Sequence, residues 1–143
     1  MKKEIAVEII SFLFIVLFTY AAVTKLMDFE KFRVQVGQSP LLTAFGGPIS
    51  RCIPAAELVT AVLLAVPRYK MIALYSSFSL MVLFSAYIIY ILNFSIYIPC
   101  SCGGVLQNMG WTQHLVFNLF FTALALAGVL FYSEKQDTQA QAA

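Results

Sequence analysis

Four long apolar stretches, separated by polar segments, dominate the pattern of residues along the chain. They cover residues 5–26, 52–66, 71–93 and 112–132. A helix needs about 20 mainly apolar residues to cross a bilayer. The pattern therefore predicts an all-α integral membrane protein. Its transmembrane domain is expected to be a four-helix bundle over residues 1–132, followed by a polar, disordered cytoplasmic tail over residues 133–143.

The connection between the first two stretches has a helical pattern of its own. Phe29, Phe32 and Val36 recur at positions i, i+3 and i+7, and charged residues occupy the positions between them. This spacing predicts a short amphipathic helix that lies on the membrane surface. Gly46, Gly47 and Pro48 are expected to break the helix and turn the chain into the second span.

Composition narrows the choice of protein class. The chain has 143 residues, of which 61% are hydrophobic and 11% are charged. A soluble domain averages about 45–50% apolar and about 25% charged residues, and a chain this short cannot enclose the excess. An aromatic content of 15% argues against disorder. A net charge of +2 with scattered basic residues argues against a nucleic-acid partner, so membrane lipid is the expected surrounding.

Topology places the two long connections, residues 28–50 and 94–111, on one side of the membrane. Basic residues are slightly more frequent on the other side. That side holds Lys2, Lys3, Arg68, Lys70 and Lys135, against Lys25, Lys31, Arg33 and Arg51 on the side of the long connections. The positive-inside rule then favours a multi-pass protein of a bacterial-type inner membrane with both termini in the cytoplasm. The first stretch could also be read as a secretory signal, but it is longer than a typical signal core, and we expect it to be retained.

The three cysteines, Cys52, Cys100 and Cys102, all fall on the predicted outer side, where disulfides persist. Two cysteines separated by one residue can just meet the geometry of a disulfide, and a strained disulfide is the more oxidising kind. Cys52 stands beside Arg51 near the expected start of the second span, and both features favour a thiolate. The pattern indicates a thiol–disulfide oxidoreductase with Cys52 as the attacking thiol and Cys100/Cys102 as the exchanging pair.

Two other interpretations of the cysteines remain open. In the first, Cys52 forms a structural disulfide with one loop cysteine, and the protein is a non-catalytic scaffold subunit of an envelope complex. In the second, the three cysteines and His114 bind a metal, since zinc accepts such a ligand set and thiolates also suit Cu(I). The spacing matches no zinc-finger or zinc-ribbon pattern, so our primary expectation includes no metal.

Polar residues on the fourth span form a stripe. His114, Asn118 and Thr122 recur at i, i+4 and i+8, and polar groups in a membrane helix usually face the bundle. The stripe could bind a quinone through His114 and Asn118, or it could hold helices together.

One carboxylate, Glu57, lies inside the second span. An intramembrane carboxylate needs a partner and is a functional candidate by default. Lys25 and Arg51 are the candidate partners, although Lys25 could instead pair with Asp28. At 100° per residue, Glu57 lies about 140° around the helix from Cys52, so contact between the two is not expected.

The segment Tyr20-Ala-Ala-Val-Thr-Lys25-Leu-Met-Asp28-Phe-Glu-Lys-Phe32, the following Ser39-Pro40 and the cysteine loop before the fourth span resemble the MauE branch of the DoxX-like membrane proteins. The resemblance covers residues 5–132. It implies four membrane helices and a redox-associated role beside a thioredoxin-like partner, as in the maturation of methylamine dehydrogenase, where disulfides must form. The plan is also similar to that of DsbB and VKOR, which pass electrons from thiols to quinone but carry Cys-x-x-Cys where this chain has Cys-x-Cys.

Overall fold

The computed structural model describes residues 2–38, 43–94 and 111–142, and these ranges contain helices and no strand. The long helices are α1 (Lys2–Met27), α3 (Gly46–Ala65), α4 (Lys70–Phe94) and α5 (Trp111–Ala142). The shorter ones are α2 (Phe29–Gln38), η1 (Thr43–Phe45) and η2 (Pro67–Tyr69). By length and composition, four helical segments could cross a membrane. The predicted all-α, four-helix membrane bundle is confirmed.

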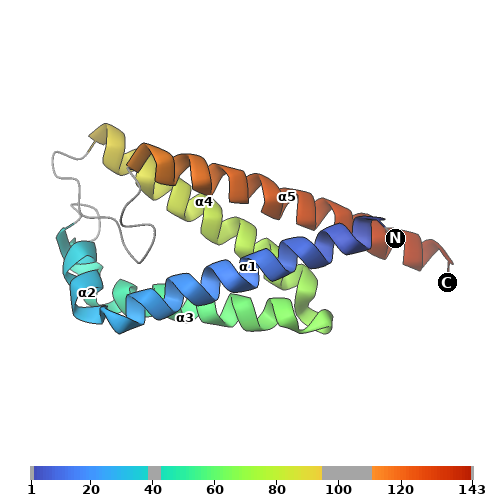
Figure 1. Ribbon diagram of the computed structural model, residues 1–143, viewed down its shortest axis with the longest axis horizontal. Helices are drawn as coiled ribbons and strands as arrows, with labels where there is room; N and C mark the ends of the chain where they lie inside the picture. The colour runs from blue at the N-terminus through green and yellow to red at the C-terminus, as the bar shows by residue number, and fades with distance from the viewer. Residues whose placement is uncertain (1, 39–42, 95–110, 143) are drawn as a thin grey trace.

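The four long helices form the corners of an elongated bundle (Figure 1). α1 packs beside α3 and α4 beside α5, and contacts between α1 and α5 and between α3 and α4 close the bundle. Successive long helices run in opposite directions, so both termini lie at one end, which we call the terminal end. α2 lies at the other end, together with the end of α1 and the start of α3 (Figure 1), and we call this the α2 end.

The interior of the bundle is filled by large apolar side chains. Phe14 and Phe18 of α1 are almost fully buried, as is Leu74 of α4. The rings of Phe14 and Phe121 meet edge to face, with 5.5 Å between centroids and 83° between planes, a preferred geometry for aromatic pairs. Many outward-facing side chains are also apolar and exposed, Phe12 among them. A helix that is apolar on all sides suits a bundle surrounded by lipid.

Small residues set the closest approach between the helices, as is usual in membranes. Ala22, Ala73 and Ala125 are completely buried. At Gly128 of α5, an added Cβ would lie 3.2 Å from Leu74 Cδ2 of α4 and 3.3 Å from Ile10 Cγ2 of α1. Gly128 therefore marks a point where three helices meet with no room for a side chain.

Helix α3 begins six residues earlier than the expected start at Cys52, because Gly46, Gly47 and Pro48 form its first turn instead of a break. The first four N–H groups of a helix have no intrahelical acceptor, so Pro48 loses no hydrogen bond at this position. Cys52 consequently lies in the second turn of α3 rather than at its N-terminus.

Helix α2 exists where the pattern placed it, but its apolar face does not lie on lipid. Phe32 and Val36 are buried, and α2 packs mainly on α3. An added Cβ on Gly46 would lie only 3.1 Å from the Cα atom of Gly37, so the two backbones nearly touch. The predicted surface helix is therefore a cover on the end of the bundle.

The expectation of a disordered tail is wrong, because α5 continues as a helix to Ala142. Glutamate, lysine, glutamine and alanine, which are good helix formers, are frequent after residue 132. Glu134 pairs with Lys3, and Lys135 lies 3.3 Å from Glu4, so ion pairs also tie this extension to α1.

We predict that Gly128→Leu destabilises the protein by about 1–3 kcal/mol, the usual cost of overpacking a core. Ala123→Leu is the matched control, because Ala123 is exposed on the same helix. Denaturation of both variants in detergent micelles checks the prediction. Equal stability of the two variants would contradict the close contact at Gly128.

Candidate functional site at the α2 end

Two of the predicted supporting residues, Lys25 and Glu57, form a buried ion pair. Lys25 Nζ lies 2.5 Å from Glu57 Oε1, and the two side chains are 11% and 1% exposed. The last turn of α1 supplies the lysine and the middle of α3 supplies the carboxylate. Of the two candidate partners, Lys25 therefore pairs with Glu57, whereas the side chain of Arg51 is exposed. It also pairs Lys25 across helices instead of with Asp28.

Two aromatic rings complete the surroundings of the lysine. The Lys25 ammonium lies 5.7 Å from the ring centroid of Phe32 in α2 and 5.3 Å from that of Phe84 in α4. A cation over an aromatic face is stabilised most when it is removed from water. The ion pair and these rings join α1, α2, α3 and α4 at a single point.

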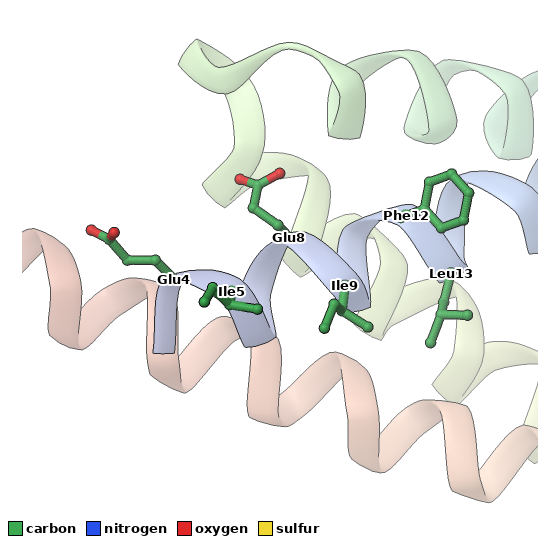
Figure 2. Close-up of a pocket in the computed structure, with 6 residues that line it drawn as sticks. All are labelled: Glu4, Ile5, Glu8, Ile9, Phe12 and Leu13. Atoms are coloured by element: carbon green, nitrogen blue, oxygen red, sulfur yellow. The ribbon is translucent and has the colours of Figure 1, made fainter. Parts of the chain in front are cut away.

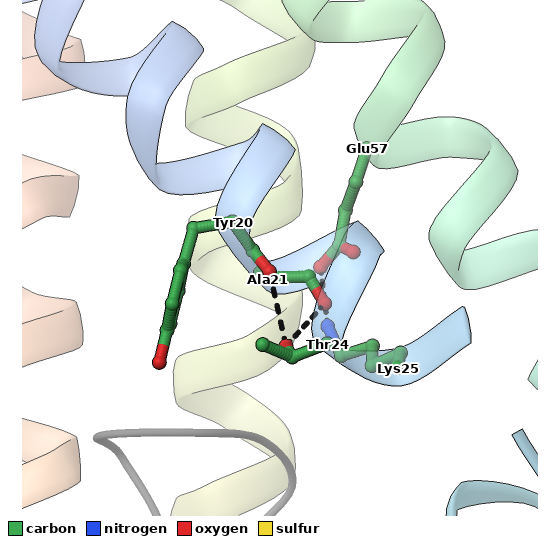
Figure 3. Close-up of polar contacts among 5 residues, drawn as sticks. All are labelled: Tyr20, Ala21, Thr24, Lys25 and Glu57. Atoms are coloured by element: carbon green, nitrogen blue, oxygen red, sulfur yellow. Dashed lines mark hydrogen bonds and ion pairs between the residues drawn. The ribbon is translucent and has the colours of Figure 1, made fainter. Parts of the chain in front are cut away.

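The carboxylate of Glu57 is only half satisfied. In Figure 3, Glu57 extends from α3 toward Lys25 at the end of α1, where the Thr24 hydroxyl donates to the carbonyl oxygens of Tyr20 and Ala21 at 3.0 Å. The Thr24 hydroxyl therefore finds its hydrogen-bond acceptors within α1. The second oxygen, Glu57 Oε2, is buried and has no hydrogen-bond partner within the part of the chain that the structure describes.

The predicted polar stripe on α5 faces the bundle in part. Asn118 is 4% exposed. Its backbone carbonyl oxygen accepts a hydrogen bond from the Thr122 hydroxyl at 2.7 Å. His114 is half-buried near the start of α5 and lies within electrostatic range of Lys25. The stripe therefore begins at the same end of the bundle as the ion pair, and its role toward a quinone stays a prediction.

The cysteines are only partly placed. Cys52 is exposed in the second turn of α3 and has no disulfide partner among the described residues. It does not lie at the helix N-terminus, as the prediction of an activated thiolate required. It is exposed whereas Glu57 is buried, as the helical angle predicted. Cys100 and Cys102 lie outside the described residues, so their meeting with Cys52 stays a prediction. No group of three metal-binding side chains occurs within the described ranges, and the metal interpretation depends on the two undescribed cysteines.

Sequence reasoning missed both aromatic partners of Lys25. Phe32 falls two helical turns after Lys25 and was assigned to the lipid face, and nothing in the sequence connects Phe84 with a residue 59 positions away. It also missed a second buried lysine, Lys70 at the terminal end, which pairs with Glu8 of α1. These contacts arise from packing between helices, so local periodicity in the sequence could not predict them.

A groove on α1 is the other candidate, and Figure 2 shows its lining. All six lining residues come from α1, and they are Glu4, Ile5, Glu8, Ile9, Phe12 and Leu13. The apolar ones are exposed, as expected for side chains that face lipid. A strip along a single helix brings no groups together for chemistry, so the α2 end is the better candidate.

Comparison with known protein families decides the family. A family model described as "Methylamine utilisation protein MauE" matches residues 3–131. The chain belongs to the MauE family. This confirms the resemblance to the MauE branch and, with the four apolar helices, makes the chain a multi-pass membrane protein. The comparisons found no matching curated protein and no matching solved structure.

We predict that Glu57→Ala lowers the free energy of unfolding by about 3–5 kcal/mol, because removing one partner leaves a buried charge uncompensated. The double variant Lys25→Met/Glu57→Leu should lose far less, since an apolar pair can replace a buried ion pair at little cost. Unfolding in detergent micelles measures both.

The control is Glu30→Ala, which removes the exposed partner of Arg33 and should cost about 1 kcal/mol or less. A double variant as unstable as Glu57→Ala would contradict the assignment of the pair.

Proposed function

We propose that this membrane protein of the MauE family performs thiol–disulfide exchange for an extracytoplasmic partner of the thioredoxin-like class. The observation that carries the proposal is that Cys52 and both ends of the segment that contains Cys100 and Cys102 lie at the α2 end of the bundle. Cys52 is exposed in the first half of α3 at the α2 end. The segment with Cys100 and Cys102 leaves α4 after Phe94 and re-enters α5 at Trp111, both at this same end.

The proposed chemistry is an oxidation of the partner. A thiolate of the partner attacks the Cys100–Cys102 disulfide, so one S–S bond breaks and a mixed disulfide forms. The partner's second thiolate then attacks the partner sulfur of the mixed disulfide, either directly or after Cys52 has replaced the loop cysteine in it, so the partner's own S–S bond forms and a thiolate of this chain leaves. The partner gains a disulfide, this chain gains two thiols, and two electrons have moved with their protons. Strained disulfides favour this direction because they are the more oxidising kind.

An acceptor must then reoxidise the two thiols, and we propose a quinone. The amide of Asn118 and the imidazole of His114 supply hydrogen-bond donors that suit the carbonyl oxygens of a quinone ring. When bound, a quinone would take up two electrons and two protons. Asn118 would orient the ring from its buried position in the bundle.

The second candidate function is a non-catalytic scaffold. In this function Cys52 forms a structural disulfide with one cysteine of the segment between α4 and α5, and the position of Cys52 at the end of the bundle where that segment begins and ends favours the pairing. The two functions predict different activities for variants that lack Cys100 and Cys102.

We expect Cys100→Ser and Cys102→Ser each to abolish oxidation of the partner's thiols while the protein still inserts and folds. Neither variant should accumulate a mixed disulfide with the partner, because the Cys100–Cys102 disulfide that the partner's thiolate attacks cannot form. Non-reducing electrophoresis and mass spectrometry of membranes measure both effects. Ser101→Ala is the control and should retain activity. Full function in the double variant Cys100→Ser/Cys102→Ser would favour the scaffold instead.

The outer location of the α2 end is proposed from charge. Lys25 and Lys70 are both buried in ion pairs, so neither acts as a flanking charge. The remaining basic residues are still slightly more frequent at the terminal end, with Lys2, Lys3, Arg68 and Lys135 against Lys31, Arg33 and Arg51 at the α2 end. The positive-inside rule then retains the terminal end in the cytoplasm.

In the Cys100→Ser/Cys102→Ser background, Cys52 should react with a membrane-impermeant maleimide added to intact cells. Arg68→Cys in a Cys52→Ser/Cys100→Ser/Cys102→Ser background places a thiol on the exposed η2 turn at the opposite end. It should react only after the membrane is permeabilised. The reverse pattern of labelling would place the α2 end in the cytoplasm and remove the basis for disulfide exchange there.

A further inference from the structure

Glu57 differs from every other acidic residue in the described ranges because it alone is buried. Its Oε1 atom is paired with Lys25, and its Oε2 atom has no hydrogen-bond partner within those ranges. The remaining acidic residues are exposed, and they are Glu4, Glu8, Asp28, Glu30, Glu134 and Asp137.

The half-satisfied carboxylate is costly if it serves only to fasten two helices. An unsatisfied buried polar group costs about 1–3 kcal/mol, and more when it is charged. A buried ion pair can often be replaced by apolar residues without loss of stability. The arrangement therefore suits a group that accepts an additional donor at Oε2, and the smallest such donor is a proton delivered by water.

The contacts of Lys25 allow its partner, Glu57, to be neutral as well as charged. The rings of Phe32 and Phe84 lie over the ammonium and stabilise it independently of the carboxylate. If Glu57 becomes neutral, Lys25 keeps these two partners and its hydrogen bond to Oε1. A lysine held only by the carboxylate would lose most of its stabilisation at that step.

We propose that Lys25 and Glu57 form a proton-binding site within the membrane-embedded bundle. A proton from water at the α2 end bonds to Glu57 Oε2, so an O–H bond of a hydronium ion breaks and a new one forms on the carboxyl group. The pair passes from zero net charge to +1, and release reverses the step. No electrons move in either direction.

Few other charges face this site. α1 contributes Lys25, and α4 contributes the uncharged ring of Phe84. His114 of α5 lies within electrostatic range of Lys25. The charged residues of α2 and of the start of α3 are exposed, and they are Glu30, Lys31, Arg33 and Arg51. Burial and the Lys25 ammonium, which act on the carboxylate in opposite senses, therefore set its proton occupancy.

The site rests on these contacts and does not depend on the cysteines. Formation of a disulfide from two thiols releases two protons, so a proton acceptor at the α2 end would serve the proposed exchange if both assignments hold. Failure of one assignment leaves the other intact, because they involve different residues.

Infrared difference spectroscopy of the full chain in lipid bilayers tests the proposal. As the pH is varied over the range in which the protein stays folded, the C=O stretch of one protonated, buried carboxyl group per chain should appear and disappear. The band should be absent in Glu57→Gln. It should persist in Glu30→Gln, which changes an exposed glutamate on α2. A wild-type spectrum identical to that of Glu57→Gln would overturn the proposal.

A second measurement covers the case in which Glu57→Gln does not fold. In wild-type protein containing ¹³C-labelled glutamate, the band should shift to lower frequency and should exchange slowly in D₂O, because Glu57 is the buried glutamate. Absence of a slowly exchanging glutamate band would equally overturn the proton-binding site.

Discussion

The bilayer core offers no water to a charged side chain, so every charge inside it must find its partners within the protein. Lys25 and Glu57 meet this constraint jointly. The ion pair joins the end of α1 to the middle of α3, and the rings of Phe32 and Phe84 bring α2 and α4 to the same ammonium. The arrangement of the α2 end follows from this pairing, because moving any one of these elements would expose a charge to hydrocarbon.

The two ends of the bundle consequently differ in character. At the terminal end, the ion pairs between α1 and α5 involve largely exposed side chains, which contribute little to stability, and the buried Lys70 pairs with Glu8, whose side chain is exposed. At the α2 end, both members of the Lys25–Glu57 pair are buried, and the half-buried imidazole of His114 and the exposed thiol of Cys52 lie at the same end. The α2 end is therefore the better candidate for a functional site.

The number and class of the helices were predictable because apolar length is a local property of sequence. Glu57 could be recognised as a buried candidate for the same reason, but its choice of Lys25 over Arg51 depends on how α1 and α3 pack. The prediction that Phe32 faces lipid is wrong, because amphipathic periodicity identifies the apolar face of a helix but not the surface against which that face packs. The predicted start of α3 is wrong, because Gly46 and Pro48 are of residue types that break the interior of a helix but are tolerated in its first turn.

The proposed thiol–disulfide exchange requires an oxidised, exchangeable pair of cysteines that includes Cys100 or Cys102. Mass-spectrometric mapping of the three cysteines, in protein purified from membranes without reductant and alkylated at once, tests it most directly. We expect one disulfide that includes Cys100 or Cys102 and becomes two alkylated thiols after reduction. Three free thiols before reduction would contradict it and leave the Lys25–Glu57 pair as the feature of the α2 end that needs a function.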